Sequence, residues 1–214
     1  MKNNVLRTLV EVALFAALGF GLDALQAGLS RGLFINGGSI GLAMVPVFII
    51  SYRRGLFPGI LCGLILSLVQ MLEGIYLVTG SDFALAPFFQ VLLDYVLGYT
   101  LVGFAGVFAK PYQNATSLKK KILYITLGVI LGGMLKYASH VLSGGFFWLG
   151  SGDYSFLGVK NSSWLYSFVY NGCYSIPNII ISLIIMILLA RFYPQFLTTK
   201  NLNETEKENN INEE

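Results

Sequence analysis

The sequence predicts an all-α integral membrane protein with six transmembrane helices. Hydrophobic residues make up 55% of its 214 residues and charged residues only 12%, whereas soluble domains carry about 25% charged residues. The hydrophobic residues gather in six runs, most of which reach the roughly 20 residues needed to cross a bilayer. Lysines and arginines gather in alternate connections between these runs. Together these features indicate a chain that crosses the membrane repeatedly.

In chain order, the predicted spans cover residues 5–28, 39–52, 55–79, 84–109, 121–149 and 162–193. The first run has a basic start but continues beyond signal-peptide length, so we expect it to be retained as a helix. The second run is short, and we expect it either to extend back through the "INGG" segment or to be irregular. The 24 glycines are typical of membrane helices that pack closely.

The basic residues predict that both termini are cytoplasmic, because cytoplasmic connections carry the excess of lysine and arginine. Eleven of the 14 lysines and arginines lie on one side: Lys2, Arg7, Arg53, Arg54, Lys110, Lys119, Lys120, Lys121, Arg191, Lys200 and Lys207. Of the remaining three, Arg31 and Lys160 fall in the opposite connections, and Lys136 lies within a span.

We expect the chain to divide into a six-helix transmembrane domain over residues 1–196 and a polar tail over 197–214, which we expect to be a disordered cytoplasmic segment. It lacks the G-x-x-x-x-G-K-[ST] pattern, so ATP binding through a P-loop is not predicted, and energy for transport must come from an ion gradient or a partner. Cys62 and Cys173 lie in apolar runs and are predicted to be buried rather than bridged or metal-bound. Neither a metal cofactor nor a nucleic-acid partner is expected.

Ionisable residues inside the spans are candidates for function, because they are costly in a bilayer. Counting from the outer ends of their spans, Asp94 is ten residues deep, and His140 and Asn171 are nine. At about 1.5 Å per residue, all three lie roughly 13–15 Å below the outer surface and can converge. Asp23 and Glu73 are expected at the outer rim. Glu11 is expected near the cytoplasmic end, solvated or paired.

The stretch "LKYASHVLSGGFFW" places Lys136, His140, Gly144 and Trp148 at steps of four, which keeps them on one face of a helix. We interpret this face as one wall of an outward-facing pocket. Other interpretations stay open: His140 as a bond between helices, Lys136 as a structural ion pair with Asp94, and Trp148 as part of an interfacial aromatic belt. The belt interpretation is favoured for Trp164.

Five strings carry a resemblance to a known family: "EVALFAALGF", "SYRRGL", "QVLLDY", "LKYASHVLSGGFFW" and "YSFVYNG". With them the chain resembles the thiamin-specific S-components, of the ThiT or YuaJ type, of energy-coupling factor (ECF) vitamin transporters. The resemblance implies a multi-pass protein of the bacterial cell membrane that captures thiamin outside the cell. It implies partners as well: a transmembrane ECF coupling subunit and two ATPase subunits, which would use the ATP.

The resemblance also implies the site. It assigns thiamin binding to Asp94 of the fourth helix, with Tyr95 beside it. From the other helices it assigns His140, Gly144, Trp148, Tyr166, Asn171 and Tyr76. A further hypothesis adds Lys136 to the site residues: in the empty state, Lys136 would form an ion pair with Asp94 until the ligand binds. In the first helix, Ala13 and Ala17 would dock on the coupling subunit, with ordinary internal packing as the alternative.

Thiamin is a permanent thiazolium cation joined to an aminopyrimidine, so a deep carboxylate flanked by aromatic rings suits it. This chain has Asp94 where the family pattern has glutamate. Two alternatives remain on the sequence. One is an S-component for another small vitamin or for the pyrimidine precursor, and the other is a self-sufficient proton-coupled transporter that uses Asp94. An intramembrane enzyme with Asp94 and His140 as acid and base is disfavoured, because the sequence shows no second histidine or nucleophile elbow.

Overall fold

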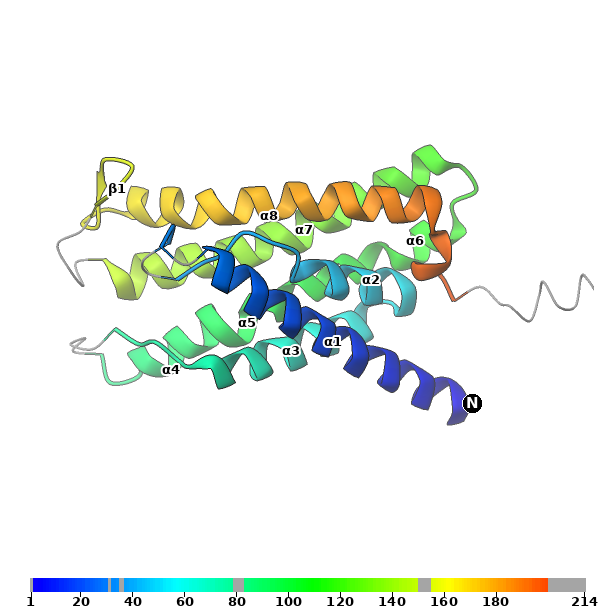
Figure 1. Cartoon of the computed structure of the whole chain (residues 1–214), viewed down its shortest axis with the longest axis horizontal. Coiled ribbons are helices and arrows are strands. Elements are labelled where there is room, and N and C mark those ends of the chain that lie inside the picture. The colour runs from blue at the N-terminus through cyan, green and yellow to red at the C-terminus, as the bar shows by residue number, and fades with distance from the viewer. Residues whose placement is uncertain (1, 31, 35–36, 79–82, 150–154, 200–214) are drawn as a thin grey trace, which may run out of the picture.

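The computed structural model describes residues 2–30, 32–34, 37–78, 83–149 and 155–199, which form a bundle of helices (Figure 1). The long helices are α1 (Lys2–Ser30), α3 (Leu56–Gln70), α7 (Leu118–Ser143) and α8 (Trp164–Phe192), and the short helix α2 (Met44–Arg54) lies among them. The fourth crossing is built from α4 (Ala86–Gln90), η2 (Val91–Val96), α5 (Leu97–Thr100), η3 (Leu101–Phe108) and α6 (Ala109–Asn114). The remaining elements are η1 (Met71–Glu73), η4 (Gly144–Trp148), the hairpin of β1 (Ser155–Phe156) and β2 (Val159–Lys160), and η5 (Pro194–Phe196).

Within the described residues, five helices are long and apolar enough to cross a membrane: Asn4–Ser30, Leu56–Glu73, Ala86–Asn114, Leu118–Trp148 and Trp164–Phe192. They correspond to five of the six predicted spans. The second predicted span, 39–52, differs, because its helix α2 has 11 residues and covers only about 16 Å. Residues 37–43 precede α2 as irregular chain.

The irregular segment before α2 is possible inside a membrane because it is enclosed by protein. In α2, every residue from Met44 to Tyr52 is buried. The backbone N–H of Gly41 donates to Asn178 Oδ1 at 2.7 Å, and that of Ala43 donates to Gln26 Oε1 at 3.1 Å. Side chains of α1 and α8 thus replace the hydrogen bonds that a helix would supply.

The third span ends earlier than predicted, since helix continues to Glu73 rather than to residue 79. Gly74, with φ of 122°, ends the helical turn η1. Beyond it the chain is held by side chains of the fourth crossing. The Tyr76 N–H donates to Tyr95 Oη at 2.7 Å, and the Val78 N–H donates to Gln90 Oε1 at 2.9 Å. Residues 74–78 therefore border the site instead of crossing lipid.

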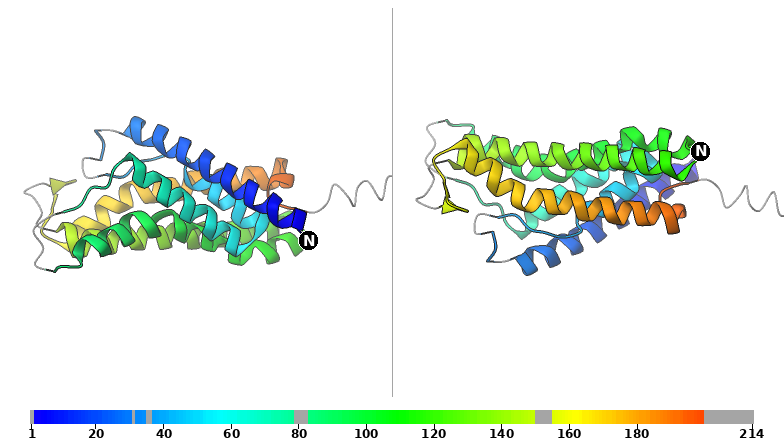
Figure 2. Two further views of the ribbon diagram at one scale, coloured as in Figure 1. Left: turned by 90° about the horizontal axis from the view of Figure 1, so that it is seen from below. Right: turned by 90° about the horizontal axis from the view of Figure 1, so that it is seen from above.

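Figures 1 and 2 show α7 and α8 side by side along the length of the bundle, while α1 crosses the other helices obliquely. The N-terminus of α1, the α6–α7 connection and the end of α8 lie at one end of the bundle (Figure 1). At that end, Glu11 forms ion pairs with Arg53 at 2.8 Å and Arg54 at 2.7 Å, so the prediction that it is solvated or paired is confirmed as pairing. Most of the predicted tail, from residue 200 onward, lies outside the described residues.

Candidate functional site

A cavity of about 840 Å³ lies in the half of the bundle that holds the end of α1, the end of α7 and the start of α8. Its walls come from α1, the segment before α2, the end of α3, the fourth crossing, α7 with η4, and α8. The structure brings all nine predicted site residues to this cavity: Tyr76, Asp94, Tyr95, Lys136, His140, Gly144, Trp148, Tyr166 and Asn171. Their roles in binding a ligand stay predictions.

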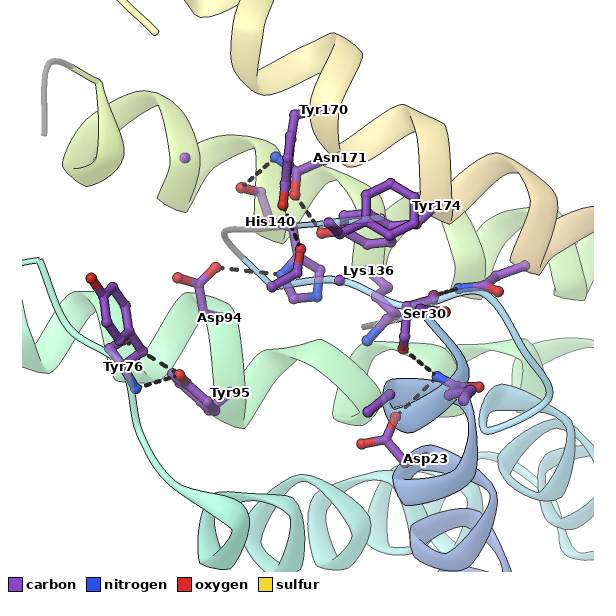
Figure 3. A pocket seen from close by; sticks show the side chains of 18 of the residues that line it. Asp23, Ser30, Tyr76, Asp94, Tyr95, Lys136, His140, Tyr170, Asn171 and Tyr174 are labelled. Atoms are coloured by element: carbon purple, nitrogen blue, oxygen red, sulfur yellow. Dashed lines mark hydrogen bonds and ion pairs between the residues drawn. The ribbon is translucent and has the colours of Figure 1, made fainter. Parts of the chain in front are cut away.

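The Asp94 carboxylate is held by three neighbours from α7 and η4, of which Figure 3 shows His140. Ser143 Oγ donates to Asp94 Oδ2 at 2.6 Å and Trp148 Nε1 donates to the same oxygen at 3.2 Å. His140 Nδ1 lies 3.4 Å from Oδ1. The carboxylate is thereby fixed in orientation and still lines the cavity.

Two π-helical segments face each other at this carboxylate, η2 with Asp94 and Tyr95, and η4 with Gly144 and Trp148. A π-helical turn leaves backbone groups without their usual partners and is frequent at functional sites. At η2, Ser139 Oγ of α7 donates to the Leu93 carbonyl at 2.7 Å. The sequence pattern gave no sign of either segment.

The predicted convergence of Asp94, His140 and Asn171 is confirmed. Besides the contact of His140 with Asp94, Asn171 Nδ2 donates to the His140 carbonyl at 3.4 Å. Asn171 also donates to the Ser167 carbonyl at 2.9 Å and accepts from the Tyr174 hydroxyl. The buried Nε2 of His140 has no hydrogen-bond partner among the described residues, so it is a donor or acceptor available to a ligand.

Stacked aromatic rings line the cavity that holds the carboxylate. The rings of Tyr76 and Trp148 are stacked with centroids 5.4 Å apart, and those of Tyr166 and Tyr170 are stacked at 5.5 Å. Flat aromatic faces beside a negative charge suit a planar cationic ligand. Trp164, in contrast, packs edge-on against Phe146 at 5.1 Å and does not line the cavity.

Two expectations for the charged residues were wrong. Lys136 does not hold Asp94 as an ion pair; its Nζ instead stands 3.7 Å from the centroid of the Tyr99 ring. Asp23 is not an outer-rim group, because it is 2% exposed and accepts a hydrogen bond from the Tyr99 hydroxyl at 2.5 Å. Both Lys136 and Asp23 contact Tyr99 of the fourth crossing. The sequence alone does not show that Tyr99 lies at the depth of these two residues.

Other lining residues escaped the sequence analysis, although the pattern held a sign of some. Tyr170, Tyr174 and Asn178 follow Tyr166 at steps of four along α8 and line the same cavity. This is the spacing that singled out the stripe on α7. Phe34 also lines the cavity and packs against Tyr174 with ring centroids 5.5 Å apart. It lies in the connection between α1 and α2, where no helical spacing could have singled it out.

Ala13 and Ala17 are exposed on the outer face of α1, whereas Val12 and Ala16 are buried against the bundle. The structure therefore does not use the predicted docking pair for packing within this chain.

Comparison with known proteins identifies the family. A family model described as "Thiamine transporter protein (Thia_YuaJ)" matches residues 9–198. The chain belongs to this thiamine transporter family. It is accordingly a multi-pass protein of the bacterial cell membrane, and the sequence resemblance to the family is confirmed.

Relatives in the thiamine transporter family match along nearly the whole chain. Thiamine transporter ThiT of Bacillus subtilis is 34% identical, with 92% of this chain and 96% of the relative covered. The protein of the same name from Lacticaseibacillus paracasei is 26% identical, with 94% of each chain covered. A solved structure of ThiT from Listeria monocytogenes matches with a TM-score of 0.70 and 29% identity, covering 91% of this chain and 99% of that one.

Proposed function

We propose that this chain is the substrate-binding subunit of an ECF-type transporter, which captures thiamin outside the cell for ATP-driven uptake. The observation that carries the proposal is the Asp94 carboxylate, oriented by Ser143 and Trp148 and flanked by stacked rings within an 840 Å³ cavity. Family membership supports thiamin as the ligand.

The chemistry of the cavity matches both halves of thiamin. The Asp94 carboxylate can neutralise the thiazolium cation or accept a charge-assisted bond from the pyrimidine amine. The Tyr76 and Trp148 rings offer a face to the cation, worth roughly 0.5–2 kcal/mol. His140 Nε2 and the Asn171 amide supply polar groups that fix the orientation of the ligand. A cavity of this volume lies within the usual range of small-molecule sites.

The orientation of the bundle rests on its charges. We infer six crossings with both termini cytoplasmic, because the basic residues gather in the connections at the end of the bundle that carries the N-terminus. The enclosed helix α2 and residues 37–43 together make the second crossing. The cavity then lies toward the outside of the cell, where a nutrient would be captured.

The energy for uptake must come from partners in this proposal. The sequence has no P-loop, so ATP would be used by two ATPase subunits joined through a transmembrane coupling subunit. Ala13 and Ala17 offer that subunit an exposed small-residue step, along which a helix can approach closely.

Titration of thiamin into the detergent-purified protein, followed by tryptophan fluorescence, tests the ligand. The chain has two tryptophans, and only Trp148 lines the cavity, so Trp164→Phe should keep the quenching and Trp148→Phe should lose most of it. Asp94→Asn should bind thiamin about 10- to 100-fold more weakly, since it removes a charge-assisted interaction.

Competition with the aminopyrimidine that lacks the thiazolium ring distinguishes the precursor alternative. If thiamin is the ligand, the precursor should bind more weakly than thiamin. Saturable binding of the precursor that equals or exceeds that of thiamin would assign the site to the precursor. A folded wild-type protein that shows no thiamin binding would overturn the proposal.

A further inference from the structure

Five charged or polar groups form a continuous line from the carboxylate at the site to a second carboxylate on α1. In order, they are Asp94, His140, Lys136, Tyr99 and Asp23, and Figure 3 labels Asp94, His140, Lys136 and Asp23. Lys136 Nζ and His140 Nε2 both border Gly98, and each lies 3.6 Å from the point where a Cβ on that glycine would stand. The two groups therefore border the same space, which the absence of a side chain at Gly98 leaves open.

Lys136 contributes the ammonium group of this line and has a carboxylate on either side of it in the order given above. Its Nζ rests on the Tyr99 ring at 3.7 Å, and the Tyr99 hydroxyl donates to Asp23 at 2.5 Å. With the Lys136 side chain 9% exposed and Asp23 2% exposed, these charges interact in a weakly screened environment.

We propose that Asp23 is a positioning residue that holds the Lys136 ammonium on the Tyr99 ring, away from Asp94, so that Asp94 is free to receive the cationic ring of the ligand. The inference rests on the proposed function, because it takes the ligand to be a cation. Without the Asp23 charge, Asp94 is the carboxylate of this line that remains to attract Lys136, and the ammonium then competes with the thiazolium ring for it.

Asp23→Asn tests this role with little change in shape. Asp23 Oδ1 accepts from both Tyr99 Oη and Gln26 Nε2, and an asparagine oxygen can accept the same two bonds. The substitution therefore removes the charge and keeps the two hydrogen bonds that Oδ1 accepts. Glu73→Gln is the matched control, since Glu73 lines the same cavity, whereas Asp23 is the carboxylate that accepts from the hydroxyl of the tyrosine carrying Lys136.

We expect Asp23→Asn to weaken thiamin binding at least about tenfold, in isothermal titration calorimetry on the full-length protein in detergent. The double variant Asp23→Asn/Lys136→Met should recover most of that loss, because the competing cation is gone. The neutral aminopyrimidine should bind wild type and Asp23→Asn with affinities within about threefold of each other. Glu73→Gln should cost less than Asp23→Asn.

The outcomes are distinguishable. Equal losses in Asp23→Asn and in the double variant would overturn the positioning role while leaving thiamin as the ligand. Equal losses for thiamin and for the neutral pyrimidine would also overturn it, because a merely structural effect ignores ligand charge. A wild type that binds no thiamin would instead overturn the proposed function, and this inference with it. Thermal unfolding of each variant confirms that the samples compared are folded.

Discussion

Among single residues, Glu11 has the densest set of charged contacts. Its carboxylate accepts hydrogen bonds from Nε of both Arg53 and Arg54. Arg53 also donates to the carbonyls of Gln195 and Thr198, at 2.6 Å each. One side chain thereby joins α1 to the end of α2 and, through Arg53, to the segment after α8. The three side chains are 12–17% exposed, so their charges are largely withdrawn from water.

Glu11→Gln should therefore lower the stability of the folded protein by roughly 3 kcal/mol, because it leaves two partly buried guanidinium groups without their counter-charge. The measurement is the thermal unfolding midpoint in detergent. Arg7→Gln is the control: the Arg7 side chain is 62% exposed, and its pair with Glu11 is expected to contribute less than about 1 kcal/mol. Equal shifts in the two variants would show that the burial of the pairs is unimportant.

At the scale of elements, the fourth crossing is placed by glycines that allow backbone contact with α3. A Cβ on Gly63 would overlap the Tyr99 carbonyl, and one on Gly103 would overlap the backbone of Gly59 and Ile60. Small residues at such crossings let membrane helices approach closely. The contact at Gly63 fixes the backbone of Tyr99, whose ring supports Lys136 at the cavity.

Gly63→Ala should consequently disturb both stability and the site. We expect a loss of about 1–3 kcal/mol from overpacking, together with weaker thiamin binding. Gly21→Ala on α1 is the matched control, since nothing lies within 4 Å of the added Cβ, and its effect should stay below about 1 kcal/mol. Thermal unfolding and thiamin titration of the two variants decide the matter, and a Gly63→Ala protein that matches wild type in both would contradict this account.

Over the whole molecule, the sequence predicted what depends on hydropathy and depth, and missed what depends on contacts between helices. Apolar runs predicted the long helices, and residue counts from their ends correctly brought Asp94, His140 and Asn171 together. The partner of Lys136 was predicted wrongly, because depth alone does not say whether Asp94 or the Tyr99 ring lies nearest. The irregular chain before α2 and the π-helical segments η2 and η4 depend on side chains from other helices, such as Asn178 and Ser139, which no local pattern reveals.

The arrangement of the whole chain also separates binding from transport. The cavity lies at one end of the bundle, while Ala13 and Ala17 lie on the outer face of α1, away from the lining residues. Ala13→Trp and Ala17→Trp should therefore keep the wild-type affinity for thiamin. In vesicles that contain this chain with the coupling and ATPase subunits proposed above, both variants should reduce ATP-driven uptake at least about tenfold, because the added bulk prevents close helix approach. Leu18→Trp, on an exposed position of the same helix that already carries a large side chain, should transport normally. Vesicles that contain this chain alone should take up no thiamin; uptake there, driven by a proton gradient, would show a self-sufficient transporter and remove the need for a docking face.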